Sequence, residues 1–187
     1  MSALALVTLA CGLTPRPTGE EPAQSAQATT SESGSLSLAA GEAGIEQMTQ
    51  ATVQVLAMVR EGQEWLPLWS GSGSIISADG LVLTNNHVVD TGLYDYDALG
   101  IAITRRSDAP PSLEYLARVV AVEPVLDLAV IRIVSDLDGN SVEPNLPYLE
   151  VGNSDEVEIG DRLRILGYPG IGGETITFTE GAVSGFT

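Results

Sequence analysis

Residues 72–84 carry the feature that most constrains how this chain can fold. Two extended segments, Ser72–Ser77 and Leu81–Thr84, are separated by the pair Asp79-Gly80. An Asp-Gly pair between two such segments is a strong signal of a β-hairpin, because both residues readily adopt the positive φ angles of a tight turn. The segment therefore predicts antiparallel β-structure in the middle of the chain.

Short segments of the same kind recur on both sides of this hairpin, each bounded by turn residues, and none has a long helical pattern. With 20 glycines and few aromatic residues, the pattern favours an all-β fold, an antiparallel barrel or sandwich. We expect the apolar segment Leu126–Val134 to be buried on both faces. The other predicted strands are Thr52–Val59, Glu64–Ser70, Gly100–Thr104, Leu113–Val122, Arg162–Leu166 and Thr175–Phe186, the last with a bend at Gly181.

The composition excludes several function classes. The formal net charge is −17, from 25 acidic and 8 basic residues, and all eight basic residues are arginine. Such a charge repels phosphate backbones, so we expect no nucleic-acid partner. Cys11 is the single cysteine and cannot form an internal disulfide, so the 44% of hydrophobic residues must supply the core. No apolar run reaches the roughly 18 residues of a membrane-spanning helix.

The first 46 residues differ from the rest in composition. Residues 1–13 resemble the apolar part of a secretion signal, and Leu9–Gly12 resembles a bacterial lipoprotein cleavage site, with Cys11 as the lipid-anchored residue. Because no Lys or Arg precedes the run and Thr8 replaces the usual Leu, a plain cleavable signal and an unstructured apolar end remain alternatives. Residues 14–46 predict a disordered tether. We expect an exported protein of the cell envelope or the extracellular space, with its folded domain at 47–187.

The chain contains one histidine, His87, and therefore one candidate for an imidazole base. A lone histidine is more often structural than catalytic. His87, however, directly follows an apolar strand, in a polar Asn-Asn break and after a glycine-rich approach that lets other backbone come close. These surroundings favour a functional role, and residues His87–Val89 predict a helical turn.

An imidazole base needs a carboxylate that fixes its tautomer and stabilises its cation. Asp90, Asp95 and Asp97 lie in a polar loop, whereas Asp127 has apolar neighbours on both sides (VLDLAVI). A charge in apolar surroundings must be paired or hydrogen-bonded. We therefore choose Asp127 as the partner of His87; the alternative is that Asp127 only marks the start of a strand and faces water.

Three blocks of residues follow one another along the chain: GSGSII at Gly71–Ile76, LTNNHVV at Leu83–Val89 and LDLAVIRI at Leu126–Ile133. Together they resemble the trypsin-like serine proteases, and most closely their HtrA (Deg) branch. The resemblance covers roughly Thr52 to Phe186, with the blocks in the family's order. Gly152–Asp155, Ile159–Asp161 and Ile165–Pro169 also resemble that branch's entry into its second barrel.

The resemblance implies two six-stranded β-barrels with an active site between them. It implies that His87 is the general base and Asp127 its orienting carboxylate, and that no metal or cofactor takes part. Unfolded, misfolded or extended polypeptides would be the substrates. Members often assemble as trimers and carry a PDZ domain, so a homo-oligomer is a further expectation.

The family's nucleophile lies in a Gly-Asn-Ser-Gly-Gly turn, and no such sequence occurs before Thr187. Ser154 is followed by two acidic residues, which would repel a developing oxyanion, and Ser184 lies in a strand pattern. We therefore assign no nucleophile. We expect a trypsin-like double β-barrel whose first barrel is complete and whose second is only begun.

The first hypothesis is that the chain is the front part of an HtrA-like serine endopeptidase, inactive as it stands because it lacks the serine. The alternative is a non-catalytic, surface-tethered relative that binds peptides in the cleft. In a third hypothesis the chain is a structural domain in which His87 and Asp127 have no catalytic role. A Gly-Asn-Ser-Gly-Gly-like turn encoded after Thr187 would favour the first hypothesis over the other two.

Overall fold

The computed structural model describes residues 44–90, 92, 95–170 and 174–186. The predictions for residues 1–13, for Cys11 and for most of the tether at 14–46 lie outside these residues. Residues 44–51 are helical, so the last three residues of the predicted tether belong to a helix. Within the part of the chain that is described, no helix is long and apolar enough to cross a membrane.

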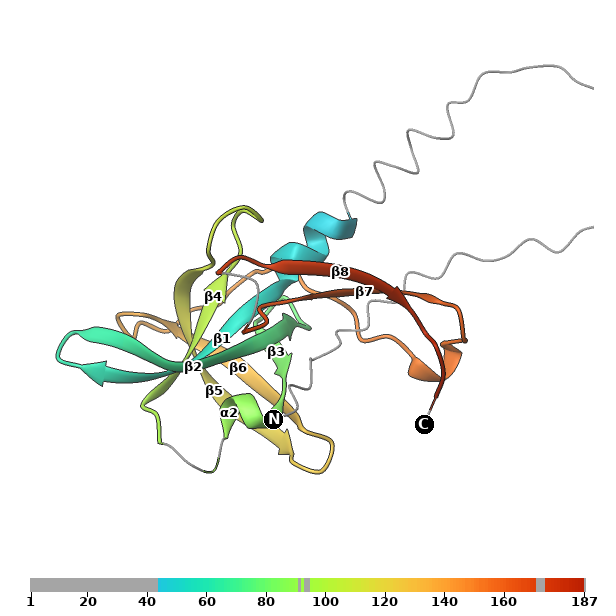
Figure 1. Cartoon of the computed structure of the whole chain (residues 1–187). Coiled ribbons are helices and arrows are strands. Elements are labelled where there is room, and N and C mark those ends of the chain that lie inside the picture. The colour runs from blue at the N-terminus through green and yellow to red at the C-terminus, as the bar shows by residue number, and fades with distance from the viewer. Residues whose placement is uncertain (1–43, 91, 93–94, 171–173, 187) are drawn as a thin grey trace, which may run out of the picture.

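Six antiparallel strands form a closed barrel in the order β1-β2-β3-β6-β5-β4 (Figure 1). The predicted hairpin is present, because Ser74 pairs with Leu83 and Gly80 takes a φ of 86° in the turn. The all-β prediction is confirmed. The barrel strands are β1 (Thr52–Glu61), β2 (Glu64–Ile75), β3 (Leu81–Thr84), β4 (Ala98–Ile103), β5 (Ser112–Glu123) and β6 (Leu128–Asp136).

The core fills the inside of this barrel and is made by alternate residues of its strands. Successive side chains of a strand point to opposite faces, so every second residue faces inward. The inward residues of three strands show the rule: Val53, Val55 and Ala57 of β1, Leu99, Ile101 and Ile103 of β4, and Ala129, Ile131 and Ile133 of β6. Val88 and Val89, from a short helix outside the barrel wall, join the same cluster.

The prediction that Leu126–Val134 is buried on both faces is wrong. The strand begins at Leu128, and its residues alternate between buried and partly exposed along its first part. A closed antiparallel barrel covers one face of each strand, and the other face meets solvent. Arg132 lies on that outer face, where its Nη1 is 2.7 Å from Oδ2 of Asp79.

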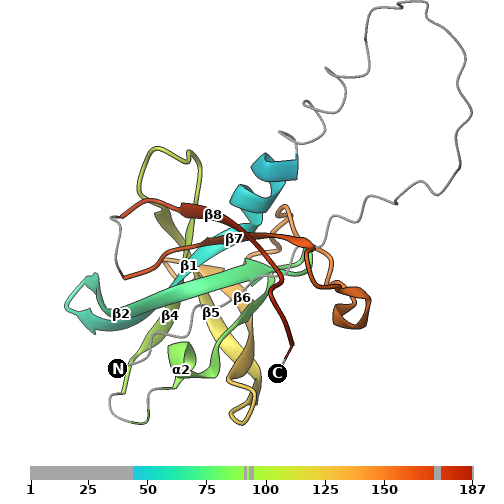
Figure 2. The same ribbon diagram turned by 45° about the vertical axis from the view of Figure 1, so that its right-hand side comes forward.

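A second sheet contains only two of the described strands, β7 (Arg162–Gly167) and β8 (Thr177–Ala182). The expectation of one complete barrel and a second barrel only begun is thus confirmed. The predicted bend at Gly181 is not present, because Gly181 pairs with Leu163 inside β8. Figure 2 shows this hairpin running along the side of the barrel, where β7 contacts β1 and β2.

Tyr168, directly after β7, attaches the second sheet to the barrel. Its backbone N–H donates to Oγ of Ser72 in β2, at 2.8 Å. Its phenol shares a hydrogen bond with the hydroxyl of Thr104, and both residues are buried. The barrel is therefore fixed to the end of β7 by hydrogen bonds.

We predict that Ser72→Ala loosens this attachment. The substitution leaves the partly buried N–H of Tyr168 without its acceptor, which should lower the free energy of unfolding by about 1–3 kcal/mol. Urea denaturation measures the change. Ser70→Ala is the matched control, because Ser70 is exposed, lies in the same strand and has only a 3.5 Å contact with Gln54; it should cost less than about 0.5 kcal/mol. Equal losses for the two variants would contradict the prediction.

Candidate active site

His87 lies on a single helical turn, α2 (Asn86–Val89), which follows β3. Asn85 ends the strand in an extended conformation, with φ −84° and ψ 150°, and the chain then turns into the helix. Thr84 is fixed before this change of direction, because its hydroxyl donates to the backbone oxygen of Ser72 at 2.8 Å. The predicted helical turn is confirmed, and it begins one residue earlier.

Asp127 lies in the turn between β5 and β6, one residue before β6 begins. It is the only non-glycine residue with a positive φ, 54°, in the described part of the chain. Aspartate tolerates this left-handed conformation better than most residues. Its backbone N–H donates to the oxygen of Pro124 at 3.2 Å, which closes the turn. The turn points the Asp127 carboxylate and its backbone oxygen toward α2.

The Asp127 carboxylate joins the two elements through His87. Oδ2 lies 2.7 Å from Nδ1 of the His87 ring, and Oδ1 accepts the backbone N–H of His87 at 2.9 Å. The carboxylate therefore holds both the ring and the start of the helical turn that carries it. The ring is 56% exposed and the carboxylate 27% exposed.

Asn85 strengthens this contact and was not singled out by the sequence analysis. Its side-chain Nδ2 donates to the backbone oxygen of Asp127 at 3.0 Å, and the N–H of Asn86 donates to the same oxygen at 3.1 Å. Asn85 is buried. The signal for it is the Asn-Asn break itself, which the sequence analysis takes as part of the surroundings of His87 and not as a contact to Asp127.

Two opposing effects set the pKa of Asp127. Partial burial is the largest single effect and raises the pKa. The hydrogen bonds from the backbone and ring of His87, the charge of His87 and the N–H of Asn86 act against it. Together they hold the pKa of Asp127 below its ordinary value of 3.8. The ionised carboxylate is therefore the form that this site favours.

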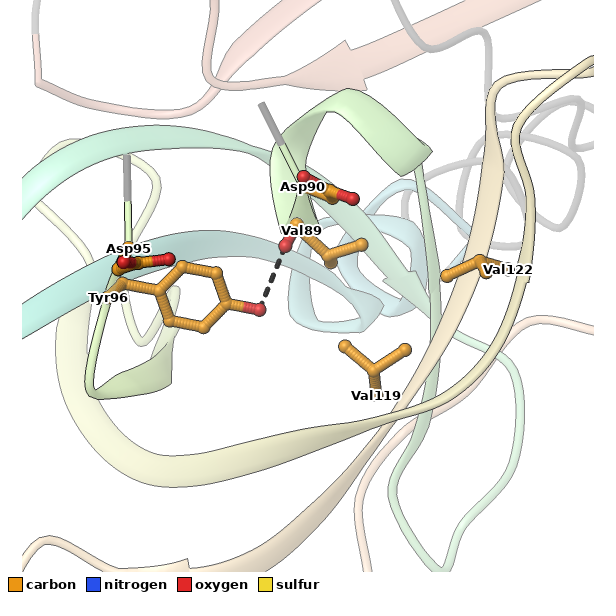
Figure 3. A pocket seen from close by; sticks show the side chains of 6 residues that line it. All are labelled: Val89, Asp90, Asp95, Tyr96, Val119 and Val122. Atoms are coloured by element: carbon orange, nitrogen blue, oxygen red, sulfur yellow. Dashed lines mark hydrogen bonds between the residues drawn. The ribbon is translucent and has the colours of Figure 1, made fainter. Parts of the chain in front are cut away.

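The three rejected aspartates are placed elsewhere. Oδ1 of Asp90 accepts the N–H of Gly92 at 2.8 Å, and Oδ2 of Asp97 accepts the N–H of Arg60 at 2.7 Å. Asp95 lines a pocket of about 350 Å³ beside α2. Figure 3 shows Asp90 and Asp95 on the rim of that pocket and the phenol of Tyr96 pointing at the backbone oxygen of Val89. Within the described residues, Asp127 is the one acidic residue that pairs with the His87 ring.

The serines considered earlier do not form part of this pair. Ser154 begins a 3-10 turn, η1 (Ser154–Glu156), whose cap is the Asn153 side chain. Ser184 follows β8 and lies outside any described strand. No serine hydroxyl is hydrogen-bonded to the His87 ring in the residues that the structure covers. The same residues contain no group of three His, Cys, Asp or Glu side chains that could hold a metal ion.

Comparison with known proteins gives consistent matches. The family model described as the trypsin-like peptidase domain matches residues 71–187. A probable periplasmic serine endoprotease, DegP-like, of Chlamydia pneumoniae is 39% identical over 115 residues, which are 61% of this chain and 19% of the relative. The protein of the same description in Brucella suis biovar 1 is 36% identical over 126 residues, 67% of this chain and 21% of the relative. The matched part of the chain thus spans about a fifth of the length of these relatives.

The lowered pKa of Asp127 predicts how stability depends on pH. A carboxyl whose pKa is lower in the folded state stabilises that state above its unfolded pKa and loses this contribution as the pH falls through the folded pKa. Asp127→Asn should therefore cost unfolding free energy at pH 6, and its difference from the wild type should shrink below pH 3.8. Urea denaturation across the pH range measures this difference.

Asp138→Asn is the control for this titration. Asp138 is exposed, and its carboxylate takes part in no hydrogen bond found in the described residues. Its substitution should change the unfolding free energy by less than about 0.5 kcal/mol at every pH. If the unfolding free energy of Asp127→Asn lies below that of the wild type by the same amount at pH 6 and below pH 3.8, the charge of the carboxylate does not contribute to stability.

Proposed function

We propose that this chain, which belongs to the trypsin-like peptidase domain family and to its HtrA branch, supplies the base and the orienting carboxylate of a serine endopeptidase. His87 is the general base and Asp127 the carboxylate. The observation that carries the proposal is the 2.7 Å contact between Nδ1 of His87 and Oδ2 of Asp127. The backbone N–H of His87, 2.9 Å from Oδ1, supports it because it ties the base to the same carboxylate.

The pairing determines what the imidazole can do. With Asp127 ionised, Nδ1 carries the proton and donates it in the hydrogen bond, which leaves Nε2 as a free acceptor. Nε2 can then take the proton of a serine hydroxyl as that oxygen attacks a peptide carbonyl, and can return it to the leaving amine. Asp127 keeps its charge throughout and stabilises the imidazolium that forms between the two steps.

The serine and the oxyanion donors are not assigned to any described residue. We propose that they come from a segment of the natural protein outside those residues. The position of the His87 ring is compatible with this, because the ring is 56% exposed and Nε2 has no partner in the described part of the chain. The barrel would then present the base to a nucleophile that a second barrel carries, as the family's architecture requires.

The proposed substrate is an extended or unfolded polypeptide. Val125 and Leu126 are 91% and 67% exposed and directly precede Asp127 in its turn. Apolar side chains at this position suit contact with apolar residues of an unfolded chain, which a folded protein keeps in its core. We also propose that the protein works in the cell envelope, because its relatives are described as periplasmic and residues 1–13 resemble an export signal.

Hydrolysis of an unfolded protein tests this function. The gene product that contains this chain, purified at its natural length, should cleave a fluorescently labelled casein. His87→Ala should lower kcat/KM by about 10⁴-fold or more, and Asp127→Asn by a comparable factor, since members of such a unit fail together. Asp136→Asn is the control, because Asp136 hydrogen-bonds Asn140 away from the site; it should retain activity.

The outcomes separate the candidate functions. Full activity in the His87→Ala protein would show that the base is assigned wrongly. Binding of casein without turnover by the wild-type protein of natural length would favour the alternative, a peptide-binding relative without catalysis. A phosphonate that labels activated serines should modify the wild-type protein and leave the His87→Ala protein unmodified.

A further inference from the structure

The helical turn that carries His87 is too short to hold its own conformation. α2 has four residues, and an isolated helix of this length is unstable because nucleation fixes several residues for a single hydrogen bond. Its last carbonyl groups have no partner inside the helix. The Asp127 carboxylate accepts the backbone N–H of His87 and so holds the amino end of this turn. The carbonyl end needs other hydrogen-bond partners.

Two aromatic side chains bind these carbonyls. Nε1 of Trp69, in β2, donates to the backbone oxygen of Val88 at 2.9 Å. The phenol of Tyr96, in the segment before β4, donates to the oxygen of Val89 at 2.8 Å, and Figure 3 shows this bond. The two rings pack edge to face, with centroids 5.7 Å apart and planes at 83°.

We propose that Trp69 and Tyr96 form an aromatic clamp that positions His87 for its contact with Asp127. The clamp acts through the backbone of α2, because both of its hydrogen bonds go to carbonyl groups of that turn. The clamp rests on the function proposed above. It adds two residues that hold the carbonyl end of α2, opposite the end that Asp127 contacts.

Residues of α2 also pack closely against the barrel. A Cβ atom added to Gly71 would lie 2.4 Å from Cγ2 of Val88, so the backbone of β2 already lies against the Val88 side chain. Val88 and Val89 are buried in the barrel core. The His87 ring is half-exposed, and its hydrogen bond within the described residues is the one to Asp127. That bond needs the backbone of α2 to stay in place, because the ring moves with the backbone that carries it.

Trp69 and Tyr96 suit this task chemically. Each offers one hydrogen-bond donor on a large rigid ring, which fixes the acceptor with little loss of side-chain entropy. Burial of the ring, and next the negative charge of Asp90, raise the pKa of the Tyr96 phenol above its ordinary value of 10.0. The phenol therefore stays protonated, and stays a donor, at any pH at which the His87–Asp127 pair would work.

The test removes each donor and keeps an aromatic ring at each position. Trp69→Phe and Tyr96→Phe, alone and together, are compared with the wild-type chain of 187 residues. The readout is the exchange rate of the His87 Nδ1 proton with water, followed by NMR on protein labelled with ¹⁵N in histidine. We expect exchange to become about tenfold faster in each single variant, the equivalent of one hydrogen bond, and faster still in the double variant.

Two matched controls make the same chemical changes away from α2. Trp65→Phe alters the other tryptophan of β2, whose ring centroid lies 5.4 Å from Cζ of Arg60, and Tyr148→Phe alters an exposed tyrosine. Both should leave the exchange rate within about twofold of the wild type. Urea denaturation of all variants measures the free energy of unfolding. If the two side chains only stabilise the fold, the exchange rate should change in proportion to that free energy.

An exchange rate that rises in the clamp variants at nearly unchanged global stability would support the clamp. A rate that is unchanged, or that rises only in proportion to lost global stability, would overturn it. Because the readout needs no turnover, failure of the clamp is distinguishable from failure of the proposed hydrolysis. In an active protein of natural length, the clamp variants should lower kcat about tenfold and leave KM nearly unchanged.

Discussion

The contact between the turn at Asp127 and the helical turn at His87 is the interaction on which the candidate site depends. The two residues are 40 positions apart in sequence, and one carboxylate hydrogen-bonds both Nδ1 of the histidine ring and the backbone N–H of the same residue. One group therefore contacts both the His87 ring and the backbone of α2. Asn85 secures the same junction from the other direction by donating to the backbone oxygen of Asp127. Such reciprocal contacts hold a polar pair in place at a partly exposed surface, where a single ion pair would contribute little.

The barrel makes this contact possible by fixing the strands that lead into it. β3, which leads to α2, pairs with β6, which follows Asp127, so that Thr84 lies opposite Ala129. The register places the end of one strand beside the start of the other. Inward side chains of all the strands fill the core, and Val88 and Val89 extend that core into α2. Packing of the apolar interior thus determines the position of two polar side chains at the rim.

Much of this could be predicted from sequence, for physical reasons that differ between residues. The Asp79-Gly80 hairpin is local, so turn chemistry alone identified it. His87 is the one available imidazole. Asp127 stands out in the sequence because its neighbours are apolar, although it has a positive φ and lies in a turn and not in a strand. The roles of Trp69 and Tyr96 depend on contacts between distant segments, which no periodicity encodes. Both faces of β6 look apolar in sequence, and only the closed barrel decides which one meets solvent.

The most direct test of the account is the tautomer of the His87 imidazole, measured from its ¹⁵N chemical shifts in the folded chain at neutral pH. We predict a proton on Nδ1 and a bare Nε2, because Asp127 accepts from Nδ1. We also predict the opposite tautomer in Asp127→Asn, where the amide can donate to Nδ1. A proton on Nε2 in the wild-type chain, or a tautomer that does not respond to the loss of the carboxylate, would contradict the claim that Asp127 prepares His87 to act as a base.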